Sequence, residues 1–368
     1  MNAPHRKRLT TVLGLAALLL ALLPAVARAG DQHRPFAPRA TGTFAVTDTT
    51  VLRPFRSGQA EVKVALNGRF ALVATDFATQ KVDLAARPHR VVGTQVGVAG
   101  HVVAIRPDSR WAYVVDEPPT VRIPNTLHVL DVRGNSLRRV RSLSGTRFAG
   151  RGEVSDLEVS RNGRFLYVKQ PNRIKVFSLR NPARPVLVRT VKAPEGGGEL
   201  SITRDGKRLL SLSTSGSGWY NVYALTTPAR PRRITTRRIS VGDAYAIASN
   251  LSTSSAYLVT DSSSIDGPTQ YVRFSGATGG GARAWTVPDF ADITDAALSP
   301  DGRYLFAVSL GGVYERSGVI DTATMRPVST LNGTSFGRAV TFSPAGRAYV
   351  VTTASSTGQR VLVEVSRR

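Results

Sequence analysis

The 368-residue sequence contains no cysteine. This absence excludes disulfide bridges, thiolate metal sites, a cysteine nucleophile and a lipid-modified N-terminal cysteine. The folded part of the chain must therefore be held together by a packed core alone, and a length of roughly 340 residues is ample for such a core.

Side chains and motifs that usually carry catalysis are also scarce. The chain has five histidines, and His89, His101 and His128 show no metal-ligand spacing. HExxH and Walker-type sequences do not occur. The sequence therefore favours a protein that is not an enzyme, and it predicts no catalytic residue.

Negative charge is in short supply as well. Asp and Glu total 25 against 49 Lys and Arg, which gives a formal net charge of +24. Such an excess favours anionic partners such as wall polymers, acidic glycans, nucleic acid or anionic lipid. The alternative is a coding bias without a partner, because only seven of the basic residues are Lys while Ala, Gly and Val are abundant.

The N-terminal 29 residues predict a secretory signal peptide. A basic start at His5–Arg8 precedes an apolar run at Val12–Val26 and a small-x-small cleavage site at Ala27–Ala29. The apolar run is shorter than the ~20 residues of a spanning helix. We therefore expect a secreted or extracytoplasmic monomer that does not span the membrane, with a flexible N-terminal segment at 30–43 and a single domain at 44–368.

A short motif recurs along the rest of the chain. It reads "VSRNGRFLYVK" at 159–169, "LSPDGRYLFAV" at 298–308 and "FSPAGRAYVVT" at 342–352. Asn-Gly and Asp-Gly between alternating apolar runs predict hairpin turns. The equivalent turns fall about 46 residues apart, a spacing typical of four-stranded propeller blades. They lie at Asn67-Gly68, Asp108-Ser109, Asn162-Gly163, Asp205-Gly206, Ser254-Ser255, Asp301-Gly302 and Ala345-Gly346.

The two ends of the repeat array predict how the ring closes. The seventh copy ends at 360–366 with a third strand and no fourth, whereas an extra strand at 51–55 precedes the first copy. An N-terminal strand that completes the last blade removes exposed sheet edges. The predicted fold is therefore an all-β, seven-bladed β-propeller of four-stranded antiparallel blades, with the last blade closed by the N-terminal strand.

Two groups of segments resemble known repeats. "LSPDGRYLFAV" and "VIDTATMRPVSTL" (319–331) resemble the YVTN-type repeat of bacterial extracytoplasmic propellers. "VFSLRNPARPVLVRTV" (176–191) and "VYALTTPARPRRI" (222–234) are similar to the LVIVD-type repeat. The resemblance covers nearly the whole mature chain and implies a seven-bladed propeller. It constrains activity little, because binding proteins and lactonase-like enzymes share this architecture.

One face of the predicted ring is basic. Connections between the first and second strands and between the third and fourth strands of every blade lie on the same face. A set of basic residues at the first of these turns predicts a docking face for a polyanion; its members are Arg69, Arg110, Arg164, Lys207, Arg208, Arg303 and Arg347. The competing interpretation is that these residues belong to the repeat itself and discourage aggregation. Too few aromatic side chains accompany them for sequence-specific nucleic-acid binding.

The opposite face carries acids just before the first strand of several blades. Together with neighbouring loop residues they predict a ligand site at the mouth of the central channel, formed by Glu61, His101, Asp156, Glu199, Asp243, Tyr245, Asp295 and Arg338. Three interpretations stay open. The carboxylates cap loops or pair with Arg, they bind a cation such as Ca²⁺, or they act in pairs as acid and base.

The favoured function is a secreted, non-catalytic propeller. It binds a ligand or partner at the acidic channel mouth and uses the basic opposite face for anionic cell-wall polymers or acidic glycans. The alternative is a lactonase-like or other hydrolase that uses the channel-mouth carboxylates with a divalent metal. No cofactor is required by the first of these functions.

Overall fold

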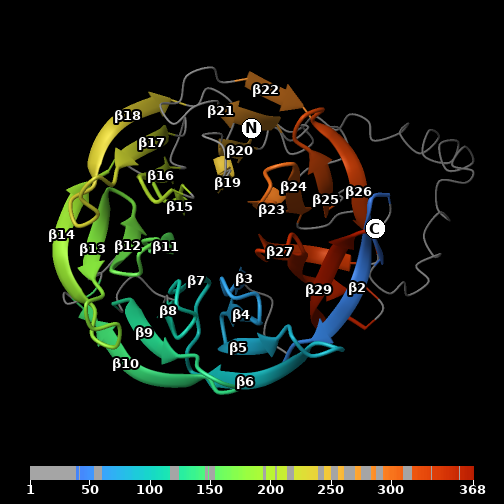
Figure 1. Cartoon of the computed structure of the whole chain (residues 1–368), viewed down its shortest axis with the longest axis horizontal. Coiled ribbons are helices and arrows are strands. Elements are labelled where there is room, and N and C mark those ends of the chain that lie inside the picture. The colour runs from blue at the N-terminus through green and yellow to red at the C-terminus, as the bar shows by residue number, and fades with distance from the viewer. Residues whose placement is uncertain are drawn as a thin grey trace, which may run out of the picture. The chain divides into compact units, whose positions relative to one another are not determined.

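A computed structural model shows the chain as an all-β ring of sheets in the unit Phe36–Arg368 (Figure 1). The structure describes residues 39–40, 42–53, 60–116, 124–145, 148, 154–193, 196–203, 205–213, 219–238, 244–249, 256–260, 270–274, 283–286, 293–309, 317–332, 334–355 and 357–368. Residues 1–29, the expected signal peptide, lie outside this set. Within the described residues, no helix is long and apolar enough to cross a bilayer.

The strands form seven sheets, numbered here as blades in chain order. Blade one contains β3 (Ala60–Val64), β4 (Phe70–Thr75), β5 (Ala78–Asp83) and β6 (Arg90–Val96). Blade two contains β7 (Val102–Ile105), β8 (Trp111–Asp116), β9 (Thr126–Asp131) and β10 (Arg138–Ser144). Blade three contains β11 (Asp156–Val159), β12 (Phe165–Gln170), β13 (Arg173–Ser178) and β14 (Val186–Lys192). Blade four contains β15 (Leu200–Ile202), β16 (Arg208–Ser213), β17 (Trp219–Ala224) and β18 (Arg232–Arg238).

The remaining blades complete the ring. Blade five contains β19 (Ala244–Ser249), β20 (Ala256–Thr260), β21 (Gln270–Phe274) and β22 (Arg283–Thr286). Blade six contains β23 (Ile293–Leu298), β24 (Tyr304–Ser309), β25 (Ser317–Asp321) and β26 (Arg326–Asn332), with β1 (Arg39–Ala40) added. Blade seven contains β27 (Thr334–Phe342), β28 (Ala348–Ala354), β29 (Arg360–Arg367) and β2 (Phe44–Val51). In each blade the first strand lies nearest the centre of the ring and the last lies at its rim (Figure 1).

The prediction of four-stranded blades throughout is wrong. Six of the sheets have four strands, and the sheet of blade six has five, because β1 pairs with the outer strand β26. A strand therefore lies within 30–43, the segment expected to be flexible. The closing strand is also displaced from its predicted position at 51–55, since β2 spans Phe44–Val51 and pairs antiparallel with β29.

The Asp/Asn-Gly-Arg motif forms the turn between the first two strands of a blade. In blade six the Ser299 hydroxyl donates to Asp301 Oδ1 (2.6 Å), and the same atom accepts the backbone N–H of Arg303 (3.0 Å). Gly302 has a φ of 74°, a conformation that costs glycine little. The same side chain-to-backbone bond recurs at Asn67, Asp108, Asn162 and Asp205. The polar atoms of the motif are therefore used within the turn.

The apolar core lies between neighbouring blades. One cluster joins Val102 and Tyr113 of blade two to Leu157 and Phe177 of blade three. Further clusters lie between blades one and two, three and four, five and six, six and seven, and seven and one. Full burial of one large apolar side chain is worth about 1.5–3 kcal/mol. Contacts between blades, more than contacts inside any sheet, therefore stabilise the ring.

The Pro-Ala-Arg-Pro segments contribute a second contact between blades. Tyr113 of blade two donates its hydroxyl to the carbonyl of Pro182 in blade three (3.1 Å). Tyr167 of blade three makes the same bond to Pro228 of blade four (3.0 Å). Both tyrosine rings are buried, and burial raises the pKa of each hydroxyl above its usual range. The repeated loop thus receives a hydrogen bond from the preceding blade.

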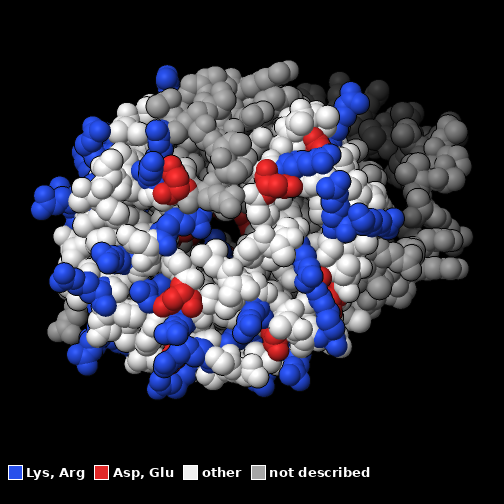
Figure 2. Space-filling model, viewed as in Figure 1, with Lys and Arg blue, Asp and Glu red and all other residues white. Residues whose placement is uncertain are grey.

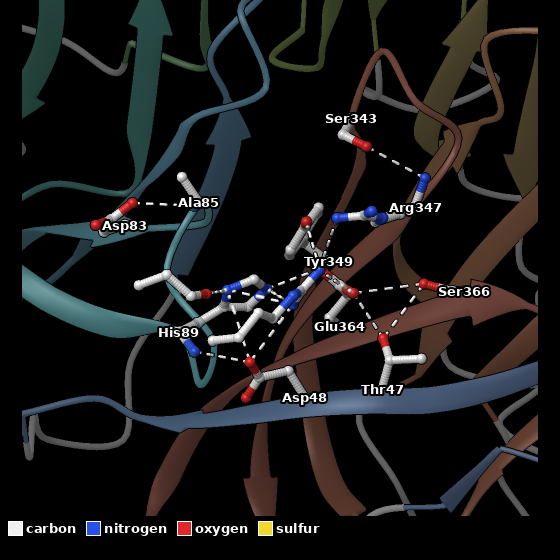
Figure 3. A network of polar contacts seen from close by, with 12 residues as sticks. Thr47, Asp48, Asp83, Ala85, His89, Ser343, Arg347, Tyr349, Glu364 and Ser366 are labelled. Carbon is white, nitrogen blue, oxygen red and sulfur yellow. Dashed lines mark hydrogen bonds and ion pairs between the residues drawn. The ribbon is translucent and has the colours of Figure 1, made fainter.

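A buried carboxylate, Glu364, joins the closing strand to blade one (Figure 3). It accepts hydrogen bonds from Tyr349 (2.6 Å), from Thr47 of β2 (2.6 Å) and from Arg87 in the loop between β5 and β6 (3.0 Å). His89 Nε2 lies 2.7 Å from the same carboxylate. Burial alone would raise the pKa of Glu364, but these hydrogen bonds outweigh it and hold the pKa well below its usual range. This cluster fixes the first blade to the last.

The substitution Glu364→Gln tests this connection. It removes the charge while keeping the shape, and we expect it to destabilise the protein at pH 7 by about 3 kcal/mol because Arg87 loses its charged partner and one acceptor oxygen of the buried cluster becomes a donor. The folded pKa of Glu364 is lowered, so its stabilising contribution is present above the unfolded pKa of about 4.3 and is lost as the pH falls further. The gap in thermal midpoint between wild type and variant should therefore narrow below about pH 4.

Ser366→Ala is the matched control for this measurement by circular dichroism. The Ser366 hydroxyl lies 3.4 Å from Glu364 and 3.2 Å from the Thr47 hydroxyl, both long contacts, so its loss should change the midpoint little. A gap of equal size at pH 3 and pH 7 would contradict a depressed pKa at Glu364.

Candidate ligand-binding channel

A cavity of about 750 Å³ occupies the centre of the ring. Its walls come from the first strands of the blades, including β3, β11, β15, β23 and β27. Figure 2 shows one face of the molecule, with a hollow at its centre and Lys and Arg side chains spread over much of the surface around it. A volume in the range of roughly 300–1,000 Å³ suits a small molecule.

The structure brings most of the predicted ligand-site residues together in this cavity. Six of the eight line it: Glu61, His101, Asp156, Glu199, Asp295 and Arg338. Asp243 and the side chain of Tyr245 lie outside the described residues. Most residues of three long connections, at 116–126, 144–156 and 261–270, also fall outside them.

The sequence predicted that these acids lie just before their strands, but most of them lie within the strands. Glu61 is the second residue of β3, Asp156 is the first of β11, and Asp295 is the third of β23. Glu199 alone lies directly before its strand, β15. The carboxylates therefore belong to the wall of the channel more than to loops around its mouth.

Three of these carboxylates bind the backbone of the next blade. Glu61 accepts the N–H of Val103 in blade two (2.5 Å). Asp156 accepts the N–H of Leu200 in blade four (2.6 Å), and Asp295 accepts that of Val340 in blade seven (2.8 Å). This recurring bond supports the capping interpretation, with one addition: one capped N–H belongs to the neighbouring blade, while Asp156 and Asp295 also accept the N–H of the residue that follows each of them.

Sequence reasoning missed three charged residues of the channel, Lys63, Glu158 and Arg161. Lys63 and Glu158 each lie two positions after a predicted acid on the same inner strand, and strand side chains at i and i+2 share a face. That alternation was the signal that could have found them. Lys63 Nζ lies 2.8 Å from Glu61 Oε1, and its side chain keeps 34% of its surface exposed.

Lys63 is surrounded by more carboxylates than it can neutralise. Burial acts to lower the pKa of its amine, but the carboxylates of Glu61, Asp156 and Glu158 outweigh burial and raise that pKa well above its usual value. Among the described residues, five carboxylates and three cationic side chains line the cavity: Glu61, Asp156, Glu158, Glu199 and Asp295, against Lys63, Arg161 and Arg338. The cavity is thus acidic inside a strongly basic chain.

Three of the channel acids have raised pKa values, with burial as the main cause. Burial raises the pKa of Asp156 well above its usual value, and Glu61 and Glu158 add to this effect although Lys63 opposes it. Burial also raises the pKa of Glu158. For Asp295, burial outweighs the bond from Val340 and raises the pKa to about 7. These carboxyl groups therefore hold protons that ordinary surface carboxyl groups would release.

The predicted basic face lies at the other ends of the same strands. The backbone N–H of Leu84 donates to the carbonyl of Arg69, and equivalent bonds in four more blades hold the two connections at one end. Six of the seven predicted side chains are exposed, and Arg208 is half-buried. Two of them also lie near acids, since Arg303 is 3.6 Å from Asp321 and Arg347 is 3.8 Å from Glu364.

The described side chains bring together no group of three or more His, Asp or Glu with the geometry to hold a metal ion. The question of Ca²⁺ or another divalent cation therefore stays with experiment.

Comparison with known proteins shows the fold and no more. No family model matches the chain, and no curated protein matches it. Among solved structures, hydrazine synthase from Kuenenia stuttgartiensis is similar, with a TM-score of 0.65 and 16% sequence identity over 86% of this chain and 99% of that chain. A likeness at this identity supports the β-propeller fold.

The substitution Asp295→Asn tests the electrostatics of the channel. The pKa of Asp295 is raised in the folded protein, so this group favours folding below its unfolded pKa of about 3.9, and that contribution is lost as the pH rises to about 7. Asn is neutral at every pH, but its amide nitrogen replaces one of the two oxygens that accept the N–H groups of Ala296 and Val340. We expect the variant to have the lower thermal midpoint near pH 5, and this gap to narrow as the pH rises to about 8, because only the wild type loses stability over that range.

Asp301→Asn provides a control in which the effect of the substitution on stability depends on pH in the opposite direction. Burial raises the pKa of Asp301, but hydrogen bonds from Ser299 and Arg303 outweigh it and lower the pKa, so its contribution is lost as the pH falls. Asn occupies the equivalent turn position in blades one and three. Parallel stability profiles for Asp295→Asn and wild type between pH 5 and pH 8 would contradict the raised pKa.

Proposed function

We propose that the protein is a non-catalytic binding propeller whose central channel takes a small organic cation. The observation that carries this proposal is the surplus of carboxylates over cationic side chains in the cavity of a chain with a net charge of +24. The volume of the cavity suits an organic ligand more than a single metal ion. Export of the chain and membership of the YVTN/LVIVD-type repeat propellers form part of the same proposal.

The chemistry of the site explains why a cation would be held there. Burial raises the pKa of Asp295 to about 7, so this carboxyl group holds a proton for part of the time near neutral pH, and burial raises the pKa values of Asp156 and Glu158 as well. A bound ammonium group would replace that proton, because a nearby positive charge favours the ionised carboxylate. Binding should thus release protons to the solvent.

Proton release gives a direct test by titration calorimetry at pH 7. We expect 1,5-diaminopentane to bind and glutarate, a dianion of similar length, not to bind. The binding enthalpy should differ between phosphate and Tris buffers, which take up protons with different enthalpies. Glu158→Gln should weaken diamine binding at least tenfold, about 1.4 kcal/mol, because Glu158 faces the cavity and carries no inter-blade bond of the kind made by Asp156.

Asp205→Asn, at a turn outside the cavity, is the matched control and should leave the affinity unchanged. Binding of glutarate in place of the diamine would contradict a cation site. Calcium in the same titration tests the divalent ion.

A second candidate, hydrolysis, is favoured by the pKa of about 7 at Asp295, which suits a general acid or base. Both oxygens of this group accept backbone N–H groups, from Ala296 and Val340, so it is engaged in structure as well. Turnover of a lactone panel without diamine binding would favour a hydrolase.

The basic face completes the proposal as a contact for an anionic wall polymer or acidic glycan. Arg69, Arg110 and Arg164 are exposed beside one another in successive blades. Replacing all three by Gln should lower the salt concentration at which the protein elutes from heparin, since each lost contact reduces the number of counterions released.

The control is a triple variant in β18, the outer strand of blade four: Arg232→Gln with Arg233→Gln and Arg237→Gln. It removes the same charge at a different place. Elution shifts of the same size for both triple variants would mean that net charge, not this face, governs binding.

A further inference from the structure

The outer strands of blades two, three and four form an exposed basic rim. β10, β14 and β18 stand at the ends of their sheets, and nearly all of their residues are exposed. The three strands carry nine Lys or Arg and no Asp or Glu. Large apolar side chains lie among them, with Val140 38% exposed, Val188 48% and Ile234 36%.

The same apolar position forms a bulge in each of these strands. The pairing register skips Val140 in β10, Val188 in β14 and Ile234 in β18. It also skips Val328 in β26, the outer strand of blade six. Bulges leave an extra residue outside the ladder and interrupt an edge. The four outer strands therefore present equivalent geometry.

In blade six this edge is occupied by the chain itself. β1 pairs antiparallel with β26, and the N–H of Thr43 donates to the carbonyl of the bulged Val328 (3.1 Å). Gly42 passes so close that a Cβ there would lie 2.0 Å from the same carbonyl oxygen. Val328 is partly buried against the core as a result. The bulged edge can thus accept an added strand.

We propose that the rim of blades two to four, and β18 above all, binds an extended acidic polypeptide as an added strand. Added strands bind through main-chain hydrogen bonds, and their side chains supply specificity. The four Arg of β18 repel a second copy of the same basic edge and attract a strand with alternating acidic and apolar side chains. Within the described residues no further strand is added to β10, β14 or β18, and an edge strand of this kind favours a polypeptide over a polysaccharide.

Fluorescence anisotropy with the whole protein tests this inference. The probe is a labelled eight-residue peptide in which Glu alternates with Val or Thr. The reference peptide has the same sequence, with alternate backbone nitrogens methylated along one edge. We expect the methylated peptide to bind at least tenfold more weakly, because it cannot form a strand ladder. Arg233→Glu with Arg237→Glu should also weaken binding of the unmodified peptide at least tenfold.

Arg53→Glu with Arg368→Glu, at exposed positions outside both the rim and the basic face, is the control and should leave peptide binding unchanged. Equal binding of both peptides would overturn the inference, since charge alone would then suffice, and so would unchanged binding by the folded β18 variant. Failure of the peptide to bind at all, with heparin bound at the rim, would overturn it in favour of a polysaccharide. The methylated peptide needs no variant, so the test stands even if the β18 variant does not fold.

Discussion

Each blade is a sheet whose two faces are both apolar, so no blade can be stable without a neighbour on each side. The clusters that join blade two to blade three, or blade seven to blade one, follow from this constraint. It also explains why β2 and β29 must pair: an open array would leave two apolar faces in water. The Glu364 cluster secures the point where the array meets itself.

The repeat divides its polar residues between two tasks at opposite ends of the inner strands. At one end, Ser299 and Asp301 satisfy the backbone of a tight turn and have little capacity left for chemistry. At the other, Glu61, Asp156 and Asp295 reach across to the next blade and still line a cavity. The recurrent motif therefore builds the scaffold, and the ligand chemistry lies beside it.

Much of this arrangement could be predicted because it is local. Turn residues and strand alternation predicted the turn at Asp301-Gly302, which lies between β23 and β24 in the structure. The channel acids were found because the repeat brings equivalent positions together. Lys63, Glu158 and β1 were missed for different reasons. Lys63 and Glu158 lie two positions after the first acid on an inner strand, and only a search along every second residue of that strand would have found them. β1 pairs with a strand almost 300 residues away, which no local pattern specifies.

The three carboxylate bonds between inner strands have a dynamic consequence. Opening of one blade would free an N–H in its neighbour, at Val103, Leu200 or Val340, so local fluctuations near the axis should be shared around the ring instead of confined to one sheet. A guest in the channel would contact the same carboxylates. Ligand binding in the channel and the resistance of the ring to local opening are then thermodynamically coupled.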